Sequence, residues 1–201
     1  METHHIRASG LGTRLAIALA SLLPLAAWAA SDTTREYEVK AAYLVKLHGF
    51  VKNPETSTRP AGTLVIGILG QDPFGESFTP VEGKRIGEDV LTIRRYDRFT
   101  EDLDLPACHV LFIANSEQTN LERILADLGN APVLTVSDAE GFVETGGMIG
   151  LVLKDNRVRW EINRDTLEDA GLAASAQLLR NAVRVVGHAS RDSTRKKGSS
   201  P

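Results

Sequence analysis

The sequence predicts an α/β fold, a three-layer sandwich with a mostly parallel central sheet, helices on both faces and an antiparallel hairpin near the C-terminus. Residues 64–69, 109–114 and 133–136 are short runs that are apolar on both faces, as is typical of strands buried between two layers. Segments with helical periodicity alternate with these runs. Such alternation favours a parallel sheet with helices packed on both sides.

The first predicted element is a helix over residues 36–51. Its apolar residues recur at three- and four-residue spacing, and they are Val39, Tyr43, Leu47 and Phe50. Glu36 and Lys40 form a favourable i,i+4 pair on this helix. A strand follows at residues 64–69. Asp72 before Pro73 indicates a short helix to about residue 81, and a further strand is predicted over residues 90–95.

The second half begins with a strand over residues 109–114 and a helix that starts at Ser116 and ends before Gly129. After the strand at 133–136, two runs flank Asp155-Asn156, a pair that tolerates positive φ and predicts a two-residue hairpin turn. A two-residue turn fixes which residues of the two strands lie opposite each other. In that pairing six apolar residues share one face, namely Ile149, Leu151, Leu153, Val158, Trp160 and Ile162. Helices over residues 164–170 and 175–186 are predicted to close the fold.

Residues 1–29 have the pattern of a secretory signal peptide. Arg7 and Arg14 precede an apolar run, and Ala27-Trp28-Ala29 is a small-x-small cleavage site. An anchoring helix is the alternative, but the apolar run is shorter than the ~20 residues of a membrane span. The predicted organisation is therefore a signal peptide (1–29), one α/β domain (30–186) and a disordered basic tail (187–201), in an exported, periplasmic protein.

Charge and cysteine content narrow the choice of partners. The whole chain carries a net charge of −3, the mature chain −4, and the part before the basic tail about −7, which argues against nucleic acid as a partner. Cys108 is the only cysteine, so an intramolecular disulfide is impossible. Its position before an apolar strand favours a buried structural thiol over a redox or intermolecular role.

Candidate chemistry is sparse. Asp72 and Asp138 follow predicted strands, at the end where open α/β sheets bind ligands, although capping is the simpler role for Asp72. Ser137 and Asp138 have no histidine at a spacing that would complete a triad, and His48, His109 and His188 form no metal-binding motif. No metal, cofactor or enzymatic activity is predicted, and a hydrolase is the least favoured of the functions considered.

Several segments together resemble the YfiR family of periplasmic proteins, over nearly the whole mature chain except its tail. They are EYEVKAAYL (36–44), IGILGQDPFG (66–75), CHVLFI (108–113), LTVSD (134–138), Gly141-Phe142, GGMI (146–149) and RVRWEIN (157–163). Each motif alone is weak. Their order and compatible spacing make the resemblance specific.

The resemblance implies regulation and not catalysis. The best-known family member is a periplasmic repressor that binds the periplasmic part of an inner-membrane diguanylate cyclase and holds it inactive. An outer-membrane lipoprotein sequesters that repressor, so that cyclic-di-GMP rises and biofilm forms. The resemblance also implies a homodimeric α/β domain. Disulfides that make some members redox-responsive have no counterpart here, because Cys108 is alone.

Two hypotheses follow for this chain, with one set of candidate contact residues. The first is repression of a membrane diguanylate cyclase; the alternative is a periplasmic small-molecule-binding sensor or transport accessory protein. Candidates for partner or ligand contact lie at strand ends, in the loop before the hairpin and on the hairpin's polar face. They are Asp72, Ser137, Asp138, Phe142, Gly146, Gly147, Arg159, Glu161 and Asn163.

Overall fold

The computed structural model describes residues 23–52 and 62–187 of the chain. The chain forms two compact units, residues 1–35 and residues 36–201. Residues 1–22 of the predicted signal peptide and residues 188–201 of the predicted tail lie outside the described ranges. Among the described helices, none has the length and apolar character required to cross a membrane.

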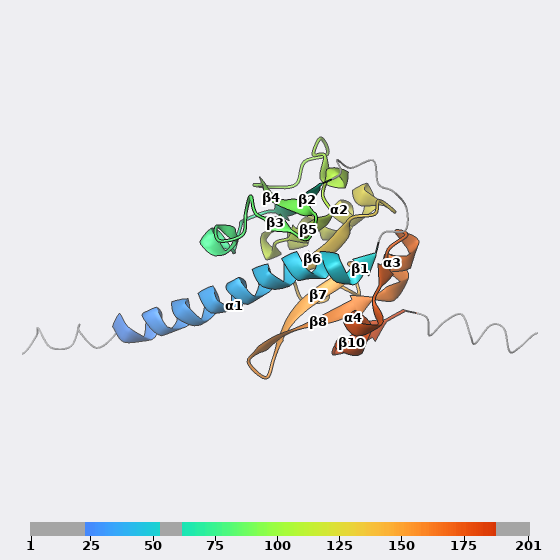
Figure 1. The fold of residues 1–201 in the computed structure, drawn as a ribbon. Coiled ribbons are helices and arrows are strands. Elements are labelled where there is room, and N and C mark those ends of the chain that lie inside the picture. The colour runs from blue at the N-terminus through green and yellow to red at the C-terminus, as the bar shows by residue number, and fades with distance from the viewer. Residues whose placement is uncertain (1–22, 53–61, 188–201) are drawn as a thin grey trace, which may run out of the picture. The chain divides into compact units, whose positions relative to one another are not determined.

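The second unit is built on an eight-stranded sheet with the strand order β10-β8-β7-β6-β5-β2-β4-β3 (Figure 1). In chain order its strands are β2 (Thr63–Leu69), β3 (Arg85–Ile86), β4 (Asp89–Tyr96), β5 (Val110–Ile113), β6 (Leu134–Ser137), β7 (Ile149–Lys154), β8 (Arg157–Asn163) and β10 (Arg184–Val186). A separate two-stranded sheet joins β1 (Val51–Lys52) to β9 (Ala173–Ala174) in antiparallel pairing.

The centre of the large sheet is parallel. β4, β2, β5, β6 and β7 are joined by parallel pairings, whereas β3 pairs antiparallel with β4 and β8 pairs antiparallel with β7. β10 then runs parallel to β8 at the other edge. The predicted fold class, a mostly parallel sheet with an antiparallel hairpin near the C-terminus, is confirmed.

Each face of the sheet has its own apolar core, which makes the fold three-layered. On one face the core contains Ala41, Leu44 and Leu47 of the helix α1 (Leu23–Phe50), together with inward residues of the strands. The short helices α3 (Arg164–Asp169) and α4 (Ala176–Arg180) add buried leucines to the same core. On the opposite face the core contains three residues of α2 (Leu121–Leu128).

The predicted hairpin is confirmed in its register. Leu153 pairs with Val158, Leu151 with Trp160 and Ile149 with Ile162. Asp155 and Asn156 have φ values of 51° and 54°, the left-handed conformation that a two-residue turn of this kind requires. The apolar face is buried at Ile149, Leu151, Val158 and Ile162 and half-buried at Trp160, whereas Leu153 at the tip is 55% exposed.

The helix predicted over residues 175–186 is wrong in its second half. The chain is helical only over Ala176–Arg180, and Arg184–Val186 forms β10. The Ser175 side chain caps the helix by accepting a hydrogen bond from the Leu178 N–H at 3.2 Å. The run of β-branched valines after Asn181 suits an extended strand better than a helix, and pairing with β8 satisfies its backbone groups.

The first helix also differs from its prediction. It extends over Leu23–Phe50, so it begins before the predicted start at residue 36, and residue 51 belongs to β1. Its buried stripe is Ala41, Leu44 and Leu47, whereas Val39 is 42% exposed. The stripe predicted from the sequence and the buried stripe both have helical spacing. Only the packing of the helix on the sheet decides which of the two is buried.

Further differences are helices of the tighter 3₁₀ type. The short helix predicted after Asp72 is a single 3₁₀ segment, η1 (Gly75–Phe78). The helix predicted from Ser116 begins as the 3₁₀ segment η3 (Asn115–Asn120) before it continues as α2. A third such segment, η2 (Leu105–Ala107), lies in the linker before β5.

Candidate recognition site at the carboxyl end of β6

The site forms because the hairpin extends past the end of its neighbour. β6 ends at Ser137, which pairs with Gly150, while β7 continues to residue 154. The corner left beside the hairpin is a hollow of about 520 Å³, here called the acidic hollow. It is lined by Glu36, Lys40, Asp138, Ala139, Glu140, Gly141, Phe142, Glu144, Gly150, Leu151, Val152, Leu153, Glu161 and Arg184.

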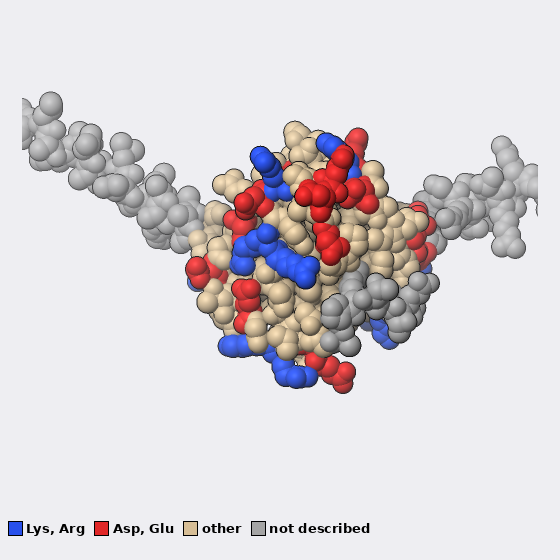
Figure 2. All heavy atoms as spheres, turned by 90° about the horizontal axis from the view of Figure 1, so that it is seen from above, with Lys and Arg blue, Asp and Glu red and all other residues tan. Residues whose placement is uncertain are grey.

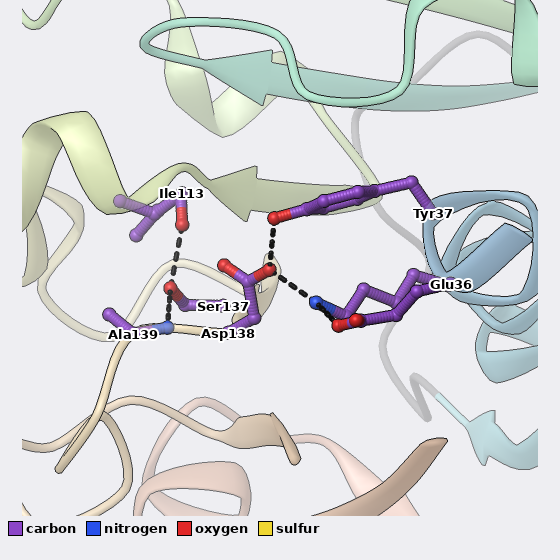
Figure 3. A network of polar contacts seen from close by, with 7 residues as sticks. Glu36, Tyr37, Ile113, Ser137, Asp138 and Ala139 are labelled. Atoms are coloured by element: carbon purple, nitrogen blue, oxygen red, sulfur yellow. Dashed lines mark hydrogen bonds and ion pairs between the residues drawn. The ribbon is translucent and has the colours of Figure 1, made fainter. Parts of the chain in front are cut away.

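A buried ion pair forms one wall of this hollow. The carboxylate of Asp138 accepts hydrogen bonds from Lys40 Nζ at 2.6 Å and from the Tyr37 hydroxyl at 2.8 Å (Figure 3). Lys40 also pairs with Glu36 at 2.5 Å, one helical turn earlier. The side chains of Lys40 and Asp138 are only 5% and 9% exposed. Their pairing therefore joins α1 to the end of β6.

Tyr37 is held in its neutral form by this environment. Burial raises the pKa of its hydroxyl well above the ordinary value, and the hydrogen bond to the Asp138 carboxylate raises this pKa further. The ring packs edge-on against Phe74 with centroids 5.5 Å apart, and Lys40 Nζ lies 4.3 Å from the Tyr37 ring centroid. Tyr37 thus keeps its proton and donates a hydrogen bond to Asp138, while its ring adds to the core.

Ser137 is buried, and its hydroxyl is used for structure. It donates a hydrogen bond to the Ile113 carbonyl at 2.6 Å and accepts one from the Ala139 N–H at 3.1 Å (Figure 3). The first bond ties β6 to β5 and the second shapes the turn that follows. A carbonyl oxygen cannot take up the hydroxyl proton, so this geometry provides no activated nucleophile.

A second ion-pair cluster forms the opposite wall. Arg184 of β10 binds both carboxylate oxygens of Glu161, at 2.9 and 2.6 Å, and also pairs with Glu144. The hydrogen bond from Arg184 lowers the pKa of Glu144, and its two acidic partners raise the pKa of Arg184. Glu161, one of the candidate contact residues, lines the hollow, but its charge is already paired with Arg184, and its contact with a partner stays a prediction.

A smaller hollow of about 370 Å³ adjoins the first. It is lined by Tyr37, Asn115, Gln118, Asp138 and Glu140. Asp138 and Glu140 line both hollows. Glu140 is exposed, so its carboxylate is available to a partner from either side.

Phe142, Gly146 and Gly147 shape the loop between the hollow and the hairpin. Phe142 is buried, and a Cβ on Gly147 would lie 2.2 Å from its ring. Residue 147 must therefore be glycine for the ring to pack. Gly146 has a φ of +106°, a conformation that side chains rarely adopt. The structure thus gives these residues a role in loop shape, and their contact with a partner stays a prediction.

The other predicted residues lie away from the hollow or serve as caps. Asp72 accepts a hydrogen bond from the Phe74 N–H at 2.7 Å and pairs with Arg95 at 2.8 Å. Asn163 caps α3 by accepting a bond from the Thr166 N–H at 3.1 Å. Arg159 is half-buried on the hairpin, outside the lining of the hollow.

Cys108 is fully buried, and its sulfur lies 3.6 Å from the Tyr96 hydroxyl. Burial and this contact with Cys108 raise the pKa of Tyr96. A Cβ on Gly67 would approach the Cys108 sulfur to 2.7 Å, so the thiol packs tightly against β2. This location agrees with the structural role favoured for the thiol.

Charges of both signs are interspersed on the face of the molecule seen in Figure 2. The acidic hollow is different. Its lining holds five carboxylates and two cations, a net charge of −3, so it favours a positively charged group. Within residues 23–52 and 62–187, no group of three or more His, Cys, Asp or Glu side chains could hold a metal ion.

Tyr37 and Lys40 were not predicted as site residues. Lys40 was identified only as the i,i+4 partner of Glu36, yet it lies three residues after Tyr37 and four before Leu44. That spacing places it on the buried face of α1. A lysine on the apolar side of a helix was the available signal, because such a charge needs a buried partner.

Comparison with known proteins gives a family and a fold. A family model described as YfiR/HmsC-like matches residues 37–183. No curated protein matches the chain. A crystal structure of a conserved domain protein from Vibrio cholerae O1 biovar El Tor is similar at 12% identity and a TM-score of 0.50, over 75% of this chain and 60% of that one. The chain thus spans less than two thirds of that relative's length.

A second similar structure is the ABC domain in complex with L-Trp from Streptococcus pneumoniae. It has 11% identity and a TM-score of 0.48, over 77% of this chain and 60% of that one.

Proposed function

Because the chain belongs to the YfiR/HmsC-like family, we propose that it is a periplasmic binding protein that represses an inner-membrane diguanylate cyclase. The observation that carries this proposal is the family match over residues 37–183, which includes most of both walls of the site but neither Glu36 nor Arg184. At the level of the family, this membership supports a periplasmic regulator of cyclic-di-GMP signalling. The repressed cyclase, the export of this chain and its homodimeric state are the finer parts of the proposal.

Repression requires that the protein bind the inactive state of the cyclase more tightly than the active state. A ligand with equal affinity for both states shifts neither. Moving the cyclase from mostly active to mostly inactive takes a preference of about 10⁴-fold between the two states. An outer-membrane lipoprotein that sequesters this protein would reverse the repression by competing for it.

The acidic hollow is the contact surface that we assign to this partner. It is open, carries a net charge of −3, and its two cations already have acidic partners. Such a surface suits a basic segment of another protein. The long-range attraction between opposite charges would also speed the encounter of the two proteins.

Deletion of the gene tests the proposal directly. Cellular cyclic-di-GMP and biofilm should rise in the deletion strain and return to the parental level when the full-length gene is restored. Unchanged cyclic-di-GMP in the deletion strain under every growth condition examined would refute repression.

The contact surface is tested by a matched pair of charge reversals. Glu140→Lys places a positive charge where both hollows meet, and should weaken repression by at least tenfold in a dose–response with inducible expression. Glu122→Lys on α2 makes the same change at an exposed position outside both hollows, and should repress like the parent. Equal repression by both variants would place the contact elsewhere.

A small-molecule sensor is the second candidate function. The hollow's volume of about 520 Å³ is within the range of known ligand pockets, and it lies at the carboxyl end of a parallel strand. A cationic metabolite that raises the melting temperature of the parent, and not of Glu140→Lys, would favour this function. If no cationic metabolite in a panel raised the melting temperature in this way, the sensor function would be refuted.

A further inference from the structure

The edge of the sheet next to the acidic hollow is open. β10 pairs with β8 on one side, and among the described residues no strand pairs with its other side. The Val183 N–H donates to the Trp160 carbonyl at 3.0 Å. In a parallel ladder, alternate residues direct their backbone groups at the neighbouring strand. The Asn163 N–H donates to the Met148 carbonyl, so Glu161 and Asn163 of β8 face β7 and Ile162 between them faces β10. Arg184 and Val186 therefore direct their backbone groups at β8, and Val185 directs its N–H and C=O toward the open side.

The side chains on this edge do not protect it. Soluble proteins commonly protect a sheet edge with charged side chains or very short strands. Both edge strands are short, with two residues in β3 and three in β10, but the β3 edge also carries the exposed charges of Lys84 and Arg85. On β10, in contrast, Val185 is 43% exposed and Val183 just before it 38% exposed. The charge of Arg184 is directed at Glu161 and Glu144.

The two faces of this edge differ in chemistry. Val185 is paired with Ile162, so its side chain lies on the apolar face of the hairpin, while Arg184 is paired with Glu161 on the face of the acidic hollow. Side chains alternate between the faces of a strand. A strand added beside β10 would therefore place every second side chain near the exposed valines and the others near the carboxylates of the hollow.

We propose that the open edge of β10 binds an extended segment of the partner protein by strand addition. The segment alternates apolar residues with lysine or arginine. Its backbone pairs with Val185, its apolar side chains cover Val183 and Val185, and its basic side chains enter the acidic hollow. Charge complementarity with the hollow, net −3, selects a basic segment. This inference rests on the proposed function, since it specifies how the partner is recognised.

The test uses the full-length protein and a labelled nine-residue peptide that alternates valine and lysine, with affinity measured by fluorescence anisotropy. We expect saturable binding that weakens at least tenfold when glutamate replaces the lysines. We expect a similar loss when the peptide is N-methylated on alternate residues along one edge, which removes its pairing N–H groups. Equal affinity of the methylated and unmethylated peptides would overturn strand addition without the need for a protein variant.

Matched variants locate the binding edge. Val185→Lys should weaken peptide binding at least tenfold, because it places a charge on the open edge. Val39→Lys makes the same kind of change at a 42% exposed position on α1, outside both hollows, and should leave the affinity within twofold. If the two variants lose affinity equally, or neither does, the proposal fails.

Two other occupants of the edge are distinguished by further measurements. If sedimentation shows a dimer that Val185→Lys converts to a monomer, the edge binds a second copy of the chain and the proposal is overturned. If reversing Arg195, Lys196 and Lys197 to glutamate strengthens peptide binding tenfold, the chain's own tail is the occupant, which also overturns it. Peptide binding is independent of cyclic-di-GMP levels in the deletion strain, so failure here and failure of repression are separable.

Discussion

At the scale of the residue, the Lys40–Asp138 pair is the most informative contact. Two nearly buried charges lose their hydration on folding, and each depends on the other to offset that loss. Tyr37 and Glu36 complete the cluster by binding one member each. The cluster connects a helix to the end of a strand about a hundred residues later in the chain, at the wall of the hollow.

Lys40→Met should destabilise the protein by about 3 kcal/mol, because it leaves a buried carboxylate without its cation. Urea unfolding of the purified protein measures this loss. Glu36→Gln serves as the control and should cost less than about 1 kcal/mol, since Glu36 is 26% exposed. The double variant Lys40→Met/Asp138→Leu should recover most of the stability. If it is no more stable than Lys40→Met alone, the coupling assigned to this pair is wrong.

Tyr37 predicts how stability changes with alkaline pH. Its folded-state pKa is raised by burial and by the Asp138 carboxylate, so the unfolded chain releases this proton first, from about pH 10 upward. The stabilisation is thus fully present below pH 10 and is lost as pH rises above it. Between pH 9 and pH 11 the urea midpoint of the parent should fall more than that of Tyr37→Phe. Parallel curves for the two proteins would contradict this account of Tyr37.

At the scale of the element, the β7–β8 hairpin is specified by its own sequence. Its two faces segregate apolar from polar residues, so a slip of one residue would reverse the burial of every side chain. Its turn requires two residues that tolerate positive φ, and Asp155-Asn156 provides them. Local sequence thus determined the turn, the register and the buried face together.

Replacement of Asn156 tests the turn. Asn156→Gly should stabilise the protein by a few tenths of a kcal/mol, because glycine adopts this conformation without strain. Asn156→Val should destabilise it by about 1–2 kcal/mol, the penalty of a left-handed conformation for a side chain with a branched Cβ. Thermal unfolding of both variants measures the difference. A loss of stability for the glycine variant would mean that the Asn156 side chain makes a contact beyond the turn.

β10 shows where local sequence misleads. Leu178, Leu179, Ala182, Val183 and Val186 have helical spacing, so the pattern predicts one helix to residue 186. In the structure, β8 offers an unpaired edge, and pairing with it outweighs the continuation of the helix after residue 180. A three-residue strand has too few positions for its own period to be recognised.

At the scale of the whole molecule, the sheet brings the site together from distant segments. Its lining comes from α1, the loop after β6, the hairpin and β10. Order along the chain does not reveal this grouping, because α1 and the loop after β6 are far apart in the sequence. They meet only through contacts such as the one between Lys40 and Asp138. Contact with a partner at this hollow would therefore depend on the complete fold and not on any single motif.

Export of the protein is tested by its N-terminus. We predict that residues 1–29 are a cleaved signal peptide, so the periplasmic fraction should contain a chain that begins at Ala30, which intact-mass spectrometry would identify. Ala29→Arg at the predicted cleavage site should leave the precursor uncleaved and membrane-associated. A mature chain that retains residues 1–29 in the soluble fraction would refute the prediction.

Sequence by itself determined the fold class, the buried strands, the hairpin register and the family. These depend on periodicity and turn chemistry that are local to a few residues, or on motifs in a fixed order. Tertiary structure alone decided which stripe of α1 is buried and that Lys40 pairs with Asp138. It also decided that residues 184–186 form an edge strand, on which Arg184 completes the hollow. Those features depend on which segments pack side by side, and the energy of that packing is shared between residues far apart in the chain.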